Sequence, residues 1–191
     1  MHDWQQTLRR IRQIKLELSA SQPAQLALGR PPGGPAPALP RGADPSAIAA
    51  AERRLRRRLP PSYRAFLLEQ DGWPQLFQGA SLLGTRQLSR TSFAELTLAT
   101  SAADDTTLAE MGARAWRESG APLIPFGMDP TGTVLFAFDP VVTGREGESE
   151  VVVWMNGIGD RCASFADLLL LVHEMLAAEL IERGDSLRQT A

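Results

Sequence analysis

The sequence predicts an α+β fold, in which an antiparallel twisted β-sheet is flanked by helices. Three observations predict it. Two short helical patterns meet at "RRLPPSYRAFLLEQDGW" (residues 57–73), consecutive apolar runs follow one another between residues 121 and 156, and a long apolar helical pattern closes the chain. These elements do not alternate strand with helix, so nothing indicates a parallel sheet.

Composition divides the chain into four parts. Residues 1–20 predict an amphipathic helix, and residues 21–43 form a linker so rich in proline and glycine that it cannot sustain helix or sheet. Residues 44–184 carry the domain, and residues 185–191 form a C-terminal tail. The apolar stripe of the leading helix contains Trp4, Leu8, Ile11 and Leu18.

Local signals set the first helices of the domain. Asp44 is a candidate N-cap and Pro45 suits the first helical position. We expect the helix to run to Leu59, because the residue before a proline avoids the helical region. Pro61 can open the second helix, and Gly72 lies where a left-handed C-cap is wanted.

Five arginines crowd the first of these helices and are expected to face mostly outward. Leu55 and Leu59 interrupt the run at core spacing, and neither an aromatic platform nor a glycine-rich loop accompanies it. A solvated helix face is therefore favoured over a nucleic-acid site. The arginines are Arg53, Arg54, Arg56, Arg57 and Arg58.

Three apolar runs in the second half predict consecutive antiparallel strands. They are "APLIPFGMD", "TVLFAFD" and "EVVVWMN", separated by turn-forming and acidic residues. Ser164 and Asp167 resemble a capping box that starts the closing helix, which we expect to end near Gly184. Shorter strand-like pieces are expected around residues 82–83, 87–88 and 96–98, and a helix from 104 to 120.

Charge is distributed unevenly although the net formal charge is only −2. Residues 1–60 carry eleven Lys or Arg against four Asp or Glu, whereas residues 61–191 carry nine against eighteen. Either the basic part folds onto the acidic body, or the acidic body meets a basic partner, or the surface is simply uneven.

The sequence predicts a protein of the cytoplasm. A single cysteine, Cys162, excludes an internal disulfide framework, which fits a reducing compartment. The N-terminus lacks the apolar stretch of a signal peptide, and the longest apolar run, residues 168–172, is far below the roughly 20 residues that span a bilayer. Neither a cofactor nor a metal is expected.

Candidate catalytic motifs are incomplete. His173 begins an H-E-x-x-H pattern, but Ala177 occupies the position of the second zinc ligand. Ser81 lacks the second glycine of a nucleophile elbow. Asp129, in "DPTGT", is similar to the nucleophile of haloacid-dehalogenase-type phosphotransferases, but the sequence also suits a tight turn between strands, which is favoured.

Two blocks in the chain resemble the SMI1/KNR4 family of the SUKH superfamily over about residues 44–182. The first is the helix with a glutamate, Leu-Pro, Tyr-Arg, an apolar helix and Asp-Gly, and the second is a Val-x-x-Trp strand followed by Ser-Phe and a closing helix. Asp71 departs from the commoner asparagine of the family. The matching positions, expected to be structural, are Glu52, Leu59, Pro60, Tyr63, Arg64, Phe66, Leu67, Gly72, Trp154 and Phe165.

The resemblance implies a non-enzymatic protein. Bacterial members are mostly immunity proteins that bind a cognate toxin, often a nuclease or deaminase, and block it. Nineteen arginines against one lysine indicate a GC-rich bacterial genome, which favours this role. Alternatives are a regulatory or scaffold module that docks through residues 4–18, and, more remotely, a phosphotransferase that uses Asp129.

Acidic residues are the expected contacts with a basic, nucleic-acid-acting toxin, because opposite fields speed association. Trp73 is either an aromatic anchor or part of the core, and residues 144–150 are either a contact loop or a solvated hairpin. Direct binding to nucleic acid or membrane is not expected. The candidate contacts are Asp71, Trp73, Asp104, Asp105, Glu146, Glu148 and Glu150.

Overall fold

The structure, a computed structural model, describes residues 4–20, 39–88, 123–155 and 158–189. The chain forms two compact units. One runs from Leu39 to Asp167, and the other combines the N-terminal helix with the last helix from Leu168 onward. The candidate helix at residues 104–120, the strand-like piece at 96–98 and residues 21–38 of the linker lie outside the described residues.

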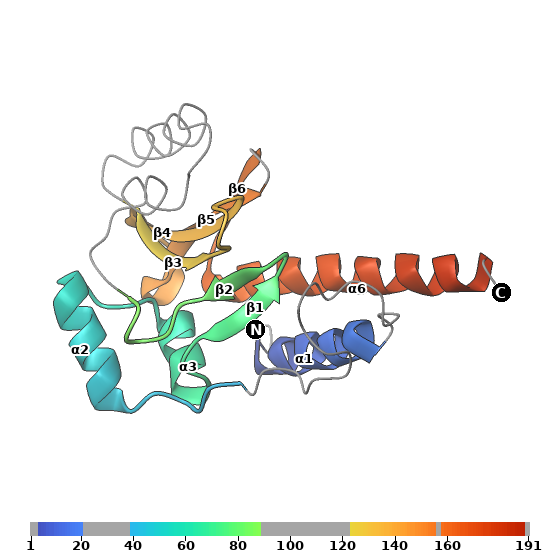
Figure 1. Cartoon of the computed structure of the whole chain (residues 1–191). Helices are drawn as coiled ribbons and strands as arrows, with labels where there is room; N and C mark the ends of the chain where they lie inside the picture. Colours follow the sequence, from blue (N-terminus) through green and yellow to red (C-terminus); the bar gives the residue numbers. More distant parts are fainter. Residues whose placement is uncertain (1–3, 21–38, 89–122, 156–157, 190–191) are drawn as a thin grey trace. The chain divides into compact units, whose positions relative to one another are not determined.

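The described elements make up an α+β structure with a six-stranded antiparallel sheet (Figure 1), as the sequence predicts. In chain order they are α1 Trp4–Ala20, α2 Pro45–Leu55, α3 Pro61–Glu69, β1 Trp73–Phe77, β2 Ala80–Leu82, β3 Ile124–Met128, β4 Val134–Thr143, the 3₁₀ turn η1 Arg145–Gly147, β5 Ser149–Met155, β6 Ile158–Cys162 and α6 Phe165–Gln189.

The sheet is a meander, in which each strand pairs with its neighbours in sequence in the order β1-β2-β3-β4-β5-β6. The central pair is β4 and β5, where Phe136 lies opposite Val153 and Leu135 lies opposite Trp154. Because successive side chains of a strand point to opposite faces, this register assigns the phenylalanines and Trp154 to different faces of the sheet.

An aromatic core occupies one face of the sheet, with Tyr63 of α3 at its centre. The Tyr63 ring lies 5.1 Å from that of Phe126, 5.2 Å from that of Phe138 and 4.9 Å from that of Phe165, measured between centroids. Phe66 stacks beside Tyr63. These rings therefore hold α3 and the start of α6 against the sheet.

The opposite face carries a second apolar cluster. Its members come from β4, β5 and the residue before β3, and Met128 packs against them. Period-two alternation along β4 and β5 accounts for this set. The cluster contains Leu123, Leu135, Ala137, Val152 and Trp154.

Helix α2 ends at Leu55, so the expectation that it would continue to Leu59 was wrong. Arg56 adopts a left-handed conformation (φ 53°), and the N–H of Arg57 donates to the carbonyl of Glu52 over 3.1 Å. This closes the helix in the manner of a C-cap, with arginine where glycine is usual. Pro61 opens α3 as predicted.

Gly72 does not cap α3, although it has the positive φ that a cap requires. The helix ends at Glu69 with Gln70 extended, and Gly72 (φ 92°) turns the chain into β1. A Cβ there would lie 2.8 Å from the Gly84 nitrogen and 2.9 Å from the Leu82 carbonyl oxygen. Glycine is thus required by a close backbone approach as well as by conformation.

The three apolar runs form β3, β4 and β5, as predicted. The expectations missed β1 and β6, and Gln87-Leu88 is not a strand: Gln87 belongs to a turn with Thr85 and Arg86, and the N–H groups of Gln87 and Leu88 both donate to the Gly84 carbonyl. The Ser164 hydroxyl accepts the Asp167 N–H over 3.2 Å, as the predicted capping box requires, and it donates to the Asp167 carboxylate over 2.7 Å. Helix α6 continues past Gly184 to Gln189.

The second unit contains α1 and most of α6. Leu8, Ile11 and Leu18 of α1 are buried, as the amphipathic pattern predicts. Burial lowers the pKa of Lys15, and the negative charge of Glu179 on α6 partly offsets this. Glu179 also pairs with Arg183 one turn later.

Candidate partner-binding surface

The signature glutamate, Glu52, supports the connection between α2 and α3. Its Oε1 accepts the backbone N–H of Leu59 over 3.1 Å. That N–H lies between the end of one helix and the prolines that open the next, where the backbone offers no helical acceptor. Glu52 and the Leu59-Pro60 pair thus fix the path of the chain between the helices.

Tyr63 is fully buried and its hydroxyl donates to the carbonyl oxygen of Leu83 over 2.5 Å. Burial raises the pKa of this phenol well above its ordinary value, and the negative charge of Asp71 acts in the same direction. Tyr63 therefore stays protonated and serves as a hydrogen-bond donor inside the core. Phe66, Leu67 and Phe165 are buried as well.

Glu148 caps a helix. Its Oε1 accepts the backbone N–H of Ser62 over 2.8 Å and its Oε2 accepts the Ser62 hydroxyl over 2.7 Å. Helix α3 has no side-chain cap from its own N-cap residue, Pro60. A carboxylate at this end satisfies a free N–H and interacts favourably with the helix dipole.

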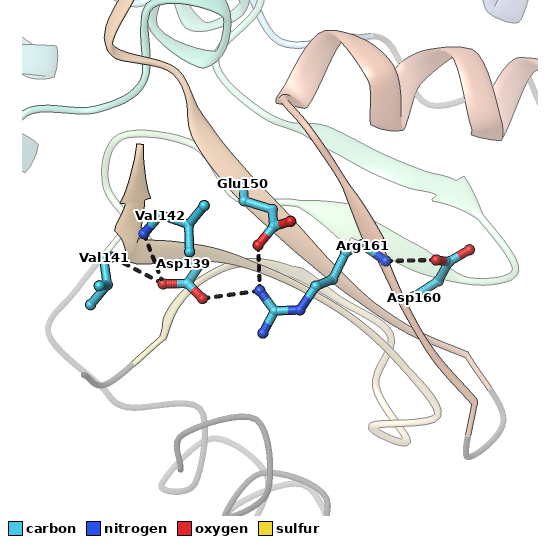
Figure 2. A network of polar contacts seen from close by, with 6 residues as sticks. All are labelled: Asp139, Val141, Val142, Glu150, Asp160 and Arg161. Atoms are coloured by element: carbon cyan, nitrogen blue, oxygen red, sulfur yellow. Dashed lines mark hydrogen bonds and ion pairs between the residues drawn. The ribbon is translucent and has the colours of Figure 1, made fainter. Parts of the chain in front are cut away.

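Glu150 belongs to an ion network on the sheet (Figure 2). Arg161 of β6 donates to Glu150 and also to the carboxylate of Asp139, 3.1 Å away. Asp139 is fully buried and also accepts the N–H of Val141 over 3.0 Å. Asp139 was not predicted as part of a site, because its partner Arg161 lies two strands away.

Arg161 stays charged in this network. Burial works to lower its pKa, but the hydrogen bonds and charges of Asp139 and Glu150 outweigh it and raise the pKa above the ordinary value. A buried carboxylate needs such compensation, because an unpaired charge away from water is costly. The network accordingly ties β4, β5 and β6 together.

Asp71 and Trp73 are also occupied within the chain. Both carboxylate oxygens of Asp71 accept hydrogen bonds from Thr85, one from its N–H and one from its hydroxyl. Trp73 is only 2% exposed, so it is a core residue and the interpretation as an aromatic anchor was wrong. The structure describes four charged candidates: Asp71, Glu146, Glu148 and Glu150. Three of them bind groups within the chain, whereas Glu146 is exposed on η1. Asp104 and Asp105 lie outside the described residues.

The carboxylate of Asp129 stabilises the tight turn between β3 and β4, and it is not positioned as a free nucleophile. Its carboxylate accepts hydrogen bonds from the N–H and hydroxyl of Thr131, the hydroxyl of Thr133 and the N–H of Val134. Gly132 supplies the positive φ of the turn. Burial works to raise the pKa of Asp129, but these donors together lower it.

Neither Ser81 nor Cys162 is in an environment that would activate it as a nucleophile. The Ser81 hydroxyl accepts the N–H of Gln75 over 2.9 Å. Burial raises the pKa of the Cys162 thiol to about 11, and the charges of Asp160, Asp167 and Glu150 act in the same direction. Among the described residues, no group of three or more His, Cys, Asp or Glu side chains is arranged to hold a metal ion.

A shallow, open depression lined mostly by arginines, called the basic hollow here, lies at the end of α2, where the sequence predicted only a solvated face. Arg54 donates to the backbone carbonyls of Thr85 and Leu88, and Arg57 donates to that of Pro140 over 2.8 Å. Two arginines of the run therefore join α2 to distant segments. The hollow is lined by Ala49, Glu52, Arg53, Arg56, Arg57 and Arg58.

An α+β domain with this signature, in which Glu52 and Tyr63 make hydrogen bonds that hold the fold, has the character of a SUKH-type domain. The family model described as "SMI1 / KNR4 family (SUKH-1)" matches residues 42–171. Because this is most of the chain, the protein belongs to the SMI1/KNR4 family, as the two sequence blocks predict. A search of curated proteins gave no match.

Within the described residues, none of the helices has the length and apolar character needed to cross a membrane.

Proposed function

We propose that this protein is an immunity-type protein of the cytoplasm, which binds a cognate bacterial toxin domain and neutralises it by covering its active site. Membership of the SMI1/KNR4 family carries the proposal. The proposed toxin acts on nucleic acid, as a nuclease or deaminase, and no catalytic step by the immunity protein itself is required.

The fate of the polar residues supports a binding role over a catalytic one. Glu52, Tyr63, Asp71 and Asp129 all make hydrogen bonds within the chain that position backbone. A catalytic acid, base or nucleophile needs a free lone pair or proton directed at a substrate. Occlusion of a toxin needs only a complementary surface.

Fewer acidic residues are proposed as contacts with the toxin than the sequence suggested. Glu148 and Glu150 are engaged in helix capping and in the ion network, so their removal would perturb the fold as well as any interface. Glu146 is exposed. We therefore propose Glu146, with Asp104 and Asp105, as the acidic contacts that attract a basic toxin surface.

The test is capture and rescue. The tagged chain is used as bait in its native organism, and any co-purifying protein encoded beside it is expressed in a bacterial host with and without this chain. We expect the C-terminal domain of that protein to stop growth, and co-expression of this chain to restore it. A neighbouring protein that is harmless, or toxic but not rescued, would refute the immunity function.

The contact residues are tested in the same assay. Glu146→Lys, Asp104→Lys and Asp105→Lys together should weaken rescue and reduce the salt dependence of toxin binding. Glu174→Lys, Glu182→Lys and Asp185→Lys together, three exposed acidic residues of α6, make the matched charge control. Equal effects of the two sets would contradict the proposed acidic contacts while leaving the immunity function intact.

The scaffold alternative depends on a free docking helix. Leu8 and Ile11 of α1 are buried within the chain, and α1 belongs to one compact unit with α6. Deletion of residues 1–43 would therefore disturb α6 as well. The exposed Leu16 offers a sharper test, because Leu16→Ser removes apolar surface from α1 without opening the core. Loss of all partners with this substitution would favour the scaffold function.

A further inference from the structure

The basic hollow at the C-terminal end of α2 is unusual in its charge. Arg53, Arg56, Arg57 and Arg58 line it and are exposed. The one acidic residue in the lining, Glu52, accepts the Leu59 N–H. Among the described residues, none of these four arginines forms an ion pair with a carboxylate. The hollow therefore presents four guanidinium groups with little internal compensation.

Stabilisation of the helix end explains only part of this cluster. Arg53 lies in the last turn of α2, where a cation interacts favourably with the dipole. The last helical residue is Leu55, so three of the arginines, Arg56, Arg57 and Arg58, follow the helix. The backbone of Arg56 is left-handed and turns the chain there. Like charges held together repel one another, and a bound anion would reduce this repulsion.

Apolar surface adjoins the hollow. Arg57 donates to the Pro140 carbonyl over 2.8 Å, which brings the end of α2 to the outer part of β4. The next two residues, Val141 and Val142, are 56% and 44% exposed. Their backbone N–H groups both point to the buried carboxylate of Asp139, so the segment that presents these valines is held in place (Figure 2).

We propose that the arginine hollow and the neighbouring Val141 and Val142 bind an acidic segment of a protein partner. Its Asp or Glu carboxylates would accept hydrogen bonds from the guanidinium groups, and an apolar side chain would cover the valines. The inference goes beyond the proposed function, because it names the chemistry of the bound segment and holds whether or not the partner is a toxin.

A protein segment fits this surface better than a nucleic acid does. Arginine binds carboxylate and phosphate equally well in a bidentate manner, so charge alone does not discriminate. The lining contains no aromatic side chain on which a base could stack. Arginine is instead enriched at protein interfaces, whose fully buried centre is more apolar than the rest of the surface.

The test uses fluorescence anisotropy of a labelled glutamate-rich peptide that carries leucines, titrated with the full-length chain at low and moderate salt. The hollow variant is Arg53→Gln, Arg56→Gln and Arg58→Gln, which spares the Arg57 contact with Pro140. The matched control is Arg9→Gln, Arg10→Gln and Arg86→Gln, three exposed arginines outside the hollow. Thermal unfolding of each variant confirms that it folds.

We expect the hollow variant to bind the peptide about tenfold more weakly than the unaltered chain and the control variant less than about twofold more weakly. Equal losses in both variants would show attraction to net charge only and would overturn the proposal. Absence of peptide binding by the unaltered chain would overturn it too.

Two further probes test the specificity. A peptide with glutamine in place of glutamate should not bind, and Val141→Thr with Val142→Thr should weaken binding of the leucine-containing peptide more than that of a leucine-free one. A single-stranded thymidine oligonucleotide of equal charge should bind more weakly than the peptide. Tighter, hollow-dependent binding of the oligonucleotide would replace the protein partner by a nucleic acid.

Discussion

Glu148 accepts hydrogen bonds from both the backbone N–H and the hydroxyl of Ser62, a residue 86 positions earlier in the chain. This pair joins the connection between β4 and β5 to the first turn of α3. An acidic loop residue that the sequence offers as a partner contact therefore has a structural task, and the two roles can be separated by experiment.

Substitution of Glu148 should destabilise the fold. We expect Glu148→Ala to lower the free energy of unfolding by about 1–2 kcal/mol, because α3 loses its only side-chain acceptor for the Ser62 N–H among the described contacts. Urea denaturation measures the change. The exposed Glu146→Ala is the matched control and should change stability by less than about 0.5 kcal/mol. Equal stability of the two variants would refute the capping role.

Asp129→Asn should remove a pH-dependent part of the stability. The folded-state pKa of Asp129 is lowered, so its contribution is present above the unfolded pKa of about 3.9 and is lost as pH falls through the folded value. We expect the variant to be about 1–2 kcal/mol less stable near neutral pH, since an amide cannot accept all four donors.

The difference between the unaltered chain and Asp129→Asn should shrink as the pH falls below about 4. Urea denaturation at a series of pH values measures it, with Glu146→Gln as the control carboxylate. A difference that stays constant with pH would show that the Asp129 carboxylate is not stabilised by its neighbours. Transfer of phosphate to the unaltered chain but not to Asp129→Asn would revive the phosphotransferase hypothesis.

Tyr63→Phe should cost about 1–2 kcal/mol of stability, because the part-buried Leu83 carbonyl loses the hydroxyl that donates to it. The phenylalanine ring keeps the packing against Phe126, Phe138 and Phe165, so near-ultraviolet circular dichroism should retain its native shape. Tyr63→Ala removes the ring as well and should cost about 3–5 kcal/mol. A Tyr63→Phe variant as stable as the unaltered chain would show that the hydroxyl adds nothing.

Cys162 should react slowly with alkylating reagents in the folded protein. With a pKa of about 11, its thiolate fraction near pH 8 is about a hundredfold below that of an unperturbed thiol. Mass spectrometry can follow iodoacetamide addition with and without urea, and a free cysteine-containing peptide serves as the control. Equal rates in the folded and unfolded chains would contradict the burial of this thiol.

Local patterns predicted the elements whose signals are local. The apolar runs of β3, β4 and β5, the capping box at Ser164 and the Asp129 turn were all predicted from neighbouring residues. Strand β6 was missed because "IGDRC" lacks an apolar alternation. Its Gly159 lies opposite Trp154, whose ring occupies the space that a Cβ would need, so packing across strands selects this residue.

Strand β1 was missed for a related reason. Pro74 and the positive φ of Gln75 break the strand pattern, and the register shifts between Trp73 and Phe77. The pairing with β2 and the burial of Leu76 compensate for these local conflicts. These stabilising contacts form only in the folded protein, so the local sequence could not predict the strand.

The candidate site was harder to predict than the fold. Whether an acidic side chain is free depends on donors that the sequence places far away, as with Glu148 and Ser62 or Glu150 and Arg161. The same argument applies to the arginines: Arg54 and Arg57 make contacts 31 to 83 residues distant, while Arg53, Arg56 and Arg58 line the hollow. Sequence spacing cannot separate these two groups.

The strictly sequential order of the sheet also determines how easily it assembles. The turn between β3 and β4 closes a loop of only a few residues, whereas joining β2 to β3 must close the long segment from Leu82 to Ile124. In a flexible unfolded chain, the longer closure costs about 2 kcal/mol more entropy. We therefore expect the hairpins from β3 to β6 to pair before β1 and β2 attach to β3.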